Sequence, residues 1–533
     1  MHEVDAVVIG AGHQGLVAAT TLAEAGLEVL VVEAEPEIGG AVRSGEPIIP
    51  GYVHDLFATN MNLFLGSPFH ARYGDELRDG GLRFATSRHP YASAFPDGAS
   101  LRVTSDPDAT LAMWRDHSAA DAEGWQRLRE VFDAFSSWYL PVYTQRQPSR
   151  SLVSAARTIR SGRKHGYSGE WASLLVASSR TLGERYFASP EAKALLAAWG
   201  MHLDYAPDIA GGAVFPLLEC FLDMINGMSL VEGGAGRLPA ALERLLERRG
   251  GQVRTGSAVE RLEAAGAVRV HLADGTSVRA RRGVVSTALV PQLARMLGPA
   301  APAPMVRAGR DYRFGPGTFM LHLALSGPVP WQDPRLAESA YVHLGGYVDD
   351  MALVYQQALS GLLPEKPLLV VGQTSVVDPT RVPREGHQVA WIQVRMVPGM
   401  IRGDAAGRIA ARTWDEAREP FADRVLDLLE RHAPAVRDVV LGVSAHAPPD
   451  LERANRNLVG GDSVSGSHHL DQFLLMRPSL ELSRYRSGVP GLFLAGAGTW
   501  PGAGVNAVSG ELAAKALLKS AHRRPWTRST SGK

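Results

Sequence analysis

The chain has 533 residues, of which 45% are hydrophobic and 21% are charged, and its formal net charge is zero. This length exceeds what one hydrophobic core supports, so two or more domain-sized units are expected. The neutral balance argues against an electrostatic nucleic-acid binder, which carries a basic surplus. The single cysteine, Cys220, excludes an internal disulfide, a dithiol redox pair and a cysteine-rich metal site.

The ends of the chain carry no predicted targeting or spanning segment. The opening "MHEVDAVVIG" lacks a basic region followed by an apolar one, so no signal peptide is predicted. No segment approaches the ~18 uninterrupted apolar residues of a spanning helix. We therefore expect a cytoplasmic protein, with peripheral membrane contact left open. The basic, polar tail at 523–533 is predicted to be disordered.

The N-terminal region reads as a βαβ unit. A run at 4–10, apolar apart from Asp5, predicts a strand covered on both faces, and helical spacing follows at 13–25. The stretch "LEVLVVEA" at 27–34 predicts a second strand.

The middle and end of the chain alternate between helical and strand patterns. The first predicted elements are a helix at 107–140, a loop at 141–168 and helical structure at 169–200. Within 231–288 the pattern predicts a helix, a strand, a hairpin that turns at 274–276 and a further strand. A linker at 299–305, short strands over 311–400, a helix over 404–435 and a βα unit at 490–520 complete the prediction.

A glycine motif joins the first strand to the first helix. Gly10, Gly12 and Gly15 form G-x-G-x-x-G, whose glycines permit a tight turn, backbone approach to a pyrophosphate and close helix–strand packing. The helix N-terminus offers N–H groups to phosphates. Glu33 ends the second strand, where a carboxylate can bind a ribose hydroxyl and repel a 2′-phosphate. The predicted dinucleotide-binding residues of this unit are Gly10, Gly12, His13, Gln14, Gly15, Glu33 and Ala34.

A second glycine turn follows the acid in "EIGGAVRS". Gly39 and Gly40 allow another backbone approach, and Arg43 supplies a cation. With this addition the sequence resembles the large group of FAD oxidoreductases, which place a Gly-Gly turn near the pyrophosphate. The resemblance implies FAD as the cofactor.

A third glycine turn, "FLAGAGTWPGAGVNAVSG" at 493–510, lies almost at the end of the chain. It resembles the C-terminal FAD signature of the bacterial phytoene desaturase family. That signature would hold the flavin end of the cofactor, with Pro501 stiffening the turn and Val505 and Asn506 beginning a helix. The chain departs from the family pattern at Trp500, which stands where a His or a small polar residue is usual. The predicted cofactor residues of this turn are Gly496, Gly498, Gly504 and Val505.

Further segments carry the same resemblance. The stretch at 231–262 is similar to the family's central glycine turn, helix and strand, in which Val259 would contact adenine through its backbone. Residues 284–288 resemble the next strand of the FAD domain. The segments 312–331 and 460–478 resemble the subgroup of pyridine nucleotide-disulfide oxidoreductase domain-containing protein 2 and the bacterial carotenoid ketolases.

The resemblance implies an α/β fold of two domains. One is a Rossmann FAD domain of the glutathione-reductase-like type, and the other is an α+β substrate domain. The implied boundaries are 1–75, 228–300 and 440–522 for the discontinuous FAD domain, and 76–227 and 301–439 for the substrate domain.

Several residues near these motifs have both a functional and a structural interpretation. His54 and Asp55 could sit near the flavin or form a hydrogen-bonded turn. His202 and Asp204 could form a proton-transfer pair in a substrate cavity, or His202 could be an ordinary buried histidine. Trp500 could face the flavin or pack under its turn.

Two other groups favour the structural interpretation. His468 and His469 lack a third ligand at suitable spacing, so a structural or surface pair is favoured over a metal site. No metal is predicted. The aromatic residues of 114–138 follow helical spacing, which favours a core over an apolar tunnel or a membrane-facing patch.

The resemblance implies an FAD-dependent oxidoreductase acting on an apolar, isoprenoid or polyene small molecule by hydride transfer to flavin N5. Desaturation, ketolation, isomerisation and reduction all remain open. One alternative is an amine oxidase-type flavoenzyme, although those enzymes place a Lys near N5 and this chain is poor in Lys. The other is a weakly catalytic flavoprotein that acts through a protein partner. Neither the electron acceptor nor the oligomeric state follows from the sequence.

Overall fold

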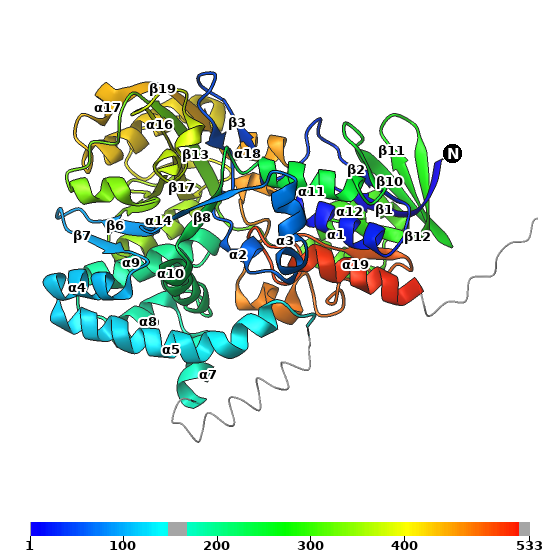
Figure 1. Ribbon diagram of the computed structural model, residues 1–533, viewed down its shortest axis with the longest axis horizontal. Coiled ribbons are helices and arrows are strands. Elements are labelled where there is room, and N and C mark those ends of the chain that lie inside the picture. Colours follow the sequence, from blue (N-terminus) through cyan, green and yellow to red (C-terminus); the bar gives the residue numbers. More distant parts are fainter. Residues whose placement is uncertain (1, 148–167, 522–533) are drawn as a thin grey trace, which may run out of the picture.

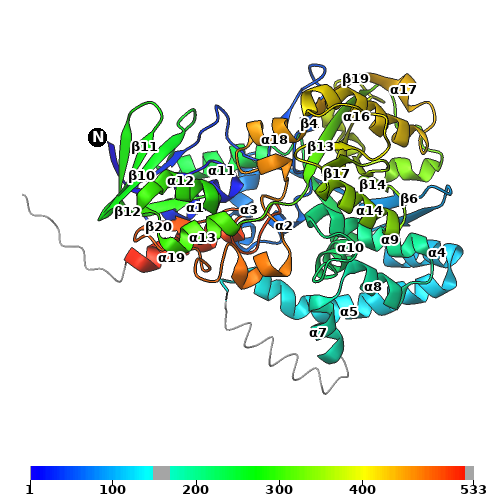
Figure 2. The ribbon, with the colours of Figure 1, turned by 180° about the vertical axis from the view of Figure 1, so that it is seen from behind.

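The computed structural model describes residues 2–147 and 168–521, which form two lobes around two separate sheets (Figure 1). Most of the predicted loop at 141–168 and all of the predicted tail at 523–533 lie outside the described residues. Figure 2 shows the same two lobes from behind.

The first sheet collects strands from three distant parts of the chain. Strand β1 pairs in parallel with β2 and β12, and β12 pairs in parallel with β20 near the C-terminus. The predicted βαβ unit and the hairpin turning at 274–276 are confirmed. The order across the sheet is β10 (Val259–Ala265), β11 (Ala267–Leu272), β12 (Ser277–Ser286), β1 (His2–Ile9), β2 (Val29–Val32) and β9 (Gln252–Arg254), with β20 (Leu492–Leu494) beside β12.

Both faces of this sheet are buried at β2 and at the second half of β1, as the apolar run of the first strand predicts. Ala6 and Val8 face one cluster of buried side chains, and Val7 and Ile9 face another. The alternation follows the two-residue period of a strand. The helices of this lobe are α1 (His13–Glu24), α2 (Asn62–Leu65), α3 (Pro68–Asp79), α11 (Arg237–Glu247), α12 (Val290–Leu297), α13 (Ala303–Asp311) and α19 (Val508–Ala521).

Two predictions in this lobe need correction. The predicted linker at 299–305 runs into helix α13, because a proline in the first turn of a helix interrupts no hydrogen bond. The last helix begins at Val508 rather than at Val505. Asn506 precedes it, and its side-chain oxygen accepts a hydrogen bond from the Val508 N–H at 2.9 Å.

The second sheet forms the floor of the other lobe. Strand β19 belongs to it through antiparallel pairing with β13, although the implied boundary at 440 assigns this strand to the FAD domain. The order is β19 (Val440–His446), β13 (Gly317–Leu325), β17 (Gln388–Val397), β16 (Leu368–Gly372), β14 (Tyr341–Leu344), β6 (Tyr91–Ala94) and β7 (Ser100–Val103). Short pairs join β3 (Ser44–Gly45) to β4 (His54–Asp55), β5 (Phe84–Ser87) to β8 (Met228–Val231) and β15 (Leu362–Leu363) to β18 (Gly403–Asp404).

Helices cover both faces of the second sheet. Phe421 and Val425 of α16 pack on one face, and Trp199 of α9 and Phe221 of α10 belong to the cluster on the other. The helices of this lobe are α4 (Pro107–His117), α5 (Ala119–Tyr143), α7 (Ser168–Val176), α8 (Ser179–Tyr186), α9 (Pro190–Gly200), α10 (Val214–Asn226), α14 (Val348–Leu359), α15 (Thr374–Val377), α16 (Trp414–Glu430), α17 (Val436–Val439) and α18 (Pro448–Ala454).

The predicted long helices are divided by serine caps. Ser118 ends α4 and caps α5, and Ser178 and Ser189 cap α8 and α9. A serine hydroxyl satisfies N–H groups that a helix start leaves open, so each serine favours a new helix. The aromatic residues of α4 and α5 lie in the core, as predicted, with Trp114 and Phe135 fully buried. None of the helices among the described residues has the length and apolar character to cross a membrane.

The side chain of Gln14 ties the first glycine turn to the last. Its amide nitrogen donates to the backbone and side-chain oxygens of Asn506 at 2.6 and 3.0 Å. Its amide oxygen accepts from the Gly510 N–H at 2.7 Å. Helices α1 and α19 lie side by side (Figure 1), and a Cβ on Gly510 would fall 2.1 Å from the Gln14 backbone oxygen. The close approach therefore requires glycine at 510.

We predict that Gly510→Ala lowers the free energy of unfolding by about 1–3 kcal/mol, because the added methyl group forces α1 and α19 apart. Urea denaturation measures the loss. Gly327→Ala is the matched control, since a Cβ at Gly327 meets nothing within 4 Å. Equal unfolding midpoints for the two variants would contradict this account.

Candidate functional site

The first glycine turn opens into a cavity of about 210 Å³ at the edge of the first sheet. Gly12 and Gly40 face each other there, and a Cβ on Gly40 would lie 3.3 Å from the Gly12 Cα. Gly15 packs its backbone against the preceding strand, where a Cβ would lie 1.9 Å from the Gly10 oxygen. The floor therefore lacks side chains, which leaves backbone N–H groups accessible to a pyrophosphate.

Glu33 lies at the end of β2 and lines the same cavity. One carboxylate oxygen accepts the Ala11 N–H at 2.6 Å, and the other accepts the Glu35 N–H at 3.0 Å. These bonds fix the carboxylate beside the turn, in the position where a dinucleotide-binding acid meets a ribose.

Arg43 supplies a cation to this cavity. Its Nη2 donates to the Ala454 carbonyl at 3.0 Å, whereas its buried Nε has no acceptor among the described residues. A guanidinium with a free N–H suits a phosphate oxygen. The glycine floor, the fixed acid and this arginine fit the pyrophosphate and ribose of a dinucleotide.

Most of the predicted cofactor residues converge on two cavities. A second cavity of about 440 Å³ lies between the lobes, and Ala41 lines both. Gly39 and Gly498 line neither cavity. Gly39 donates its N–H to the Ala11 carbonyl at 2.9 Å, and Gly498 packs close to Leu289. The predicted residues on the smaller cavity are Gly10, Gly12, His13, Gln14, Gly15, Glu33, Ala34, Gly40, Arg43, Val259 and Gly496, and those on the larger are Gly504 and Val505.

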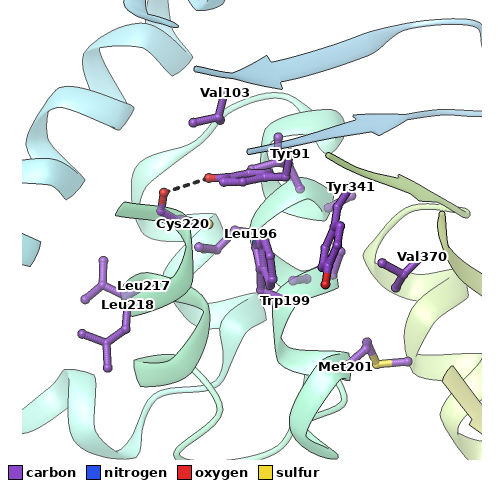
Figure 3. Packing of buried hydrophobic residues seen from close by; sticks show 14 of the residues in the cluster. Tyr91, Val103, Leu196, Trp199, Met201, Leu217, Leu218, Cys220, Tyr341 and Val370 are labelled. Carbon is purple, nitrogen blue, oxygen red and sulfur yellow. Dashed lines mark hydrogen bonds between the residues drawn. The ribbon is translucent and has the colours of Figure 1, made fainter. Parts of the chain in front are cut away.

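The larger cavity is mainly apolar and aromatic. Helices α9 and α10 form one wall, and the inner face of the second sheet forms the other. Figure 3 shows part of this wall, where Trp199 and Tyr341 lie below Tyr91. Tyr91 contacts Trp199 edge-on at a centroid distance of 5.1 Å.

A buried cation, Arg395 on β17, also lines the larger cavity. Its guanidinium donates to Thr318 Oγ1 at 3.1 Å and to the carbonyls of Met201 and His202 at 3.3 and 2.5 Å. Burial lowers its pKa to about 10. Arg395 forms no ion pair within the described chain, so its charge is held by neutral oxygens.

Two carboxyl groups of helix α10, Glu219 and Asp223, line the same cavity. Burial and mutual repulsion raise the pKa of Glu219, and burial raises that of Asp223. Neither of these residues was predicted from the sequence, and Arg395 was not predicted either. A detectable signal existed for the acids, which stand four residues apart in an otherwise apolar helix.

The structure separates the predicted pair His202 and Asp204. His202 lines the larger cavity, and its Nε2 lies 2.9 Å from His343 Nε2. Burial lowers the pKa of His202, so the ring is neutral at neutral pH. Asp204 instead accepts from Tyr355 at 2.9 Å and lies beside His469.

His54, Asp55 and Trp500 lie outside the lining of both cavities in the described chain. The Asp55 carboxylate pairs with buried Arg381 at 2.9 Å, and burial lowers the pKa of His54 to about 4. Trp500 packs under the turn against Tyr143 and Phe473. Both ring nitrogens of His54 lack a hydrogen-bond partner among the described residues, and a catalytic role for any of the three stays a prediction.

His468 supports the C-terminal turn. Its Nε2 accepts the Ala503 N–H at 3.0 Å.

No group of three His, Cys, Asp or Glu residues in the described part of the chain is arranged to hold a metal ion.

Comparison with known proteins shows the family to which the chain belongs. The family model described as flavin containing amine oxidoreductase matches residues 15–518. The chain belongs to that family. Its cofactor is FAD, and the chain is an FAD-dependent oxidoreductase.

Relatives within this flavin family match along the whole chain. Rat pyridine nucleotide-disulfide oxidoreductase domain-containing protein 2 is 28% identical, over 97% of this chain and 94% of its own. A limonene dehydrogenase chain from Castellaniella defragrans is 25% identical, over 98% of this chain and 96% of its own. Carotenoid and phytoene desaturases or dehydrogenases match at 23% to 26% identity, which confirms the resemblance to phytoene desaturases.

A solved structure confirms the two-domain FAD oxidoreductase fold. A triple mutant of putrescine oxidase aligns with a TM-score of 0.62 over 98% of this chain and 99% of its own. The sequence identity is 14%, so this likeness concerns the fold alone.

We predict that Arg43→Met raises the dissociation constant for FAD about tenfold, because one charged hydrogen bond to the cofactor is lost while the apolar stem remains. Equilibrium release of fluorescent FAD measures the constant. Arg408→Met, at an exposed position away from both cavities, is the control. An unchanged constant in Arg43→Met would place the pyrophosphate elsewhere.

Proposed function

We propose that this flavoenzyme removes hydrogen across a carbon–carbon bond of an apolar, isoprenoid-type small molecule. The observation that carries the proposal is the larger cavity of about 440 Å³, which is lined mainly by apolar and aromatic side chains. Ala41 lines both this cavity and the smaller one. Small-molecule sites range over ~300–1,000 Å³, so the cavity suits a compact isoprenoid or one end of a longer polyene.

The role of the chain in this reaction is to bind the substrate in an apolar cavity from which water is excluded. Phe57, Trp199 and Met320 present apolar surface to a substrate and exclude water. FAD supplies the hydride acceptor, flavin N5. Gly504 and Val505 would hold the flavin end, and N–H groups near the start of α19 favour negative charge there.

The names of the relatives support an isoprenoid substrate. Limonene is a small isoprenoid hydrocarbon, and carotenoids and phytoene are long ones. No Lys lines the larger cavity among the described residues, which weighs against the amine oxidase alternative.

One observation favours amine oxidation as a second candidate. Glu219 and Asp223 line the larger cavity, and a carboxylate pair can bind an ammonium group. The two candidates differ in the substrate that reduces the flavin.

Anaerobic titration of the purified holoprotein separates the candidates. We expect limonene or detergent-solubilised β-carotene to bleach the absorbance band of oxidised flavin, and putrescine and cyclohexylamine to leave it unchanged. Bleaching by the amines alone would overturn the proposal.

A further inference from the structure

Helix α10 brings two acids into an apolar cavity. Glu219 and Asp223 stand four residues apart, so they share one face of the helix. Both line the larger cavity, whereas Leu217, Phe221 and Met224 of the same helix are buried in the core. The acids therefore form a polar patch within apolar surroundings.

One buried oxygen of this patch, Asp223 Oδ2, lacks a hydrogen-bond donor among the described residues. Asp223 Oδ1 accepts from Asn62 at 2.7 Å and from Asn60 at 3.4 Å. Asp223 Oδ2 has no partner within the described chain, although the residue is only 1% exposed. A buried acceptor left unmatched is costly, so this oxygen suits a donor brought by a ligand.

The cavity wall also contains two hydrogen-bond donors, both indole N–H groups, that lack an acceptor among the described residues. The indole Nε1 atoms of Trp199 and Trp391 are buried and unpaired within the described chain, and both residues line the cavity. Trp199 lies close to α10, because Tyr91 contacts its ring and donates its hydroxyl to the Cys220 carbonyl at 3.0 Å (Figure 3). The cavity thus offers both an acceptor and donors to a bound molecule.

The charges of the cavity distinguish between possible ligands. Burial raises the pKa of both carboxyls, which favours a proton shared by the pair over two negative charges. A hydroxyl both donates and accepts, whereas an ammonium only donates and would leave the indole N–H groups unmatched. The guanidinium of Arg395 in the same cavity also disfavours a second cation.

We propose that Glu219 and Asp223 bind the hydroxyl group of an otherwise apolar isoprenoid alcohol. This inference rests on the proposed function and narrows its substrate class from isoprenoids in general to isoprenoid alcohols. The apolar skeleton would occupy the aromatic part of the cavity, and the hydroxyl would donate to Asp223 Oδ2.

Limonene and perillyl alcohol share a skeleton and differ by one hydroxyl, so they test the proposal. Their dissociation constants come from the change in flavin absorbance that binding causes in the oxidised holoprotein, with turnover separated by stopped-flow mixing. We expect the alcohol to bind at least about tenfold more tightly, the effect of one well-formed buried hydrogen bond.

Asp223→Asn is the decisive variant. Asn60 and Asn62 would keep the amide oxygen at the Oδ1 position, so a donor replaces the acceptor at Oδ2. We expect the preference for the alcohol to fall below about threefold, and the flavin content of the purified variant checks that it folds. Asp116→Asn, an exposed carboxyl on α4, is the control and should keep the preference.

The outcomes separate this inference from the proposed function. Equal affinities for limonene and perillyl alcohol in the wild type would overturn the inference alone. A preference that survives in Asp223→Asn would do the same, as would tighter binding of perillylamine than of the alcohol. If neither isoprenoid perturbs the flavin, the proposed function fails and the inference fails with it.

Discussion

The position of the C-terminal glycine turn depends on the side chain of Gln14. This residue stands inside the first glycine motif, yet all three of its side-chain hydrogen bonds reach Asn506 and Gly510, almost five hundred residues later. Because the amide is buried, losing these bonds would leave unsatisfied polar groups between α1 and α19. One turn therefore orients the other, and a cofactor as long as FAD can be held at both ends. This contact explains how the glycine turn near the C-terminus can act together with the one near the N-terminus.

The second sheet and its helical layer serve this arrangement by enclosing an apolar space beside it. The space is not uniformly apolar. Buried Arg395 on the sheet, and buried Asp223 and half-buried Glu219 on α10, line it. Burial of such groups destabilises a fold unless they find partners. Their presence in the cavity wall is more readily explained by a ligand than by stability.

The fold was predictable from the sequence where the local residue pattern directly reflects burial or close packing in the folded chain. The run at 6–9 is apolar because β1 is buried on both faces there, and Gly15 stands where close backbone approach requires glycine. The family resemblance predicted that the C-terminal turn belongs to the same FAD domain as the first one. Helix boundaries were less predictable, since serine caps at 118, 178 and 189 divide stretches whose apolar pattern is continuous.

The larger cavity could mostly not be predicted from the sequence, because its walls come from segments that meet only in the folded chain. His54 and Asp55 follow the FAD turn in sequence, but the pairing of Asp55 with Arg381 draws them into the core. Trp500 lies in the turn itself, yet its ring points beneath it toward Tyr143. Proximity in sequence to a cofactor motif does not determine which way a side chain points.

A double-mutant cycle on FAD affinity tests most directly whether Gln14 joins the two turns into one cofactor site. The cycle compares Gln14→Leu, Asn506→Leu and the double variant with the wild type. If the contact positions the turn, each single change weakens FAD binding and the double variant is about as weak as either one. Additive losses, or unchanged affinity in Gln14→Leu, would contradict the account and show that the two turns hold FAD independently.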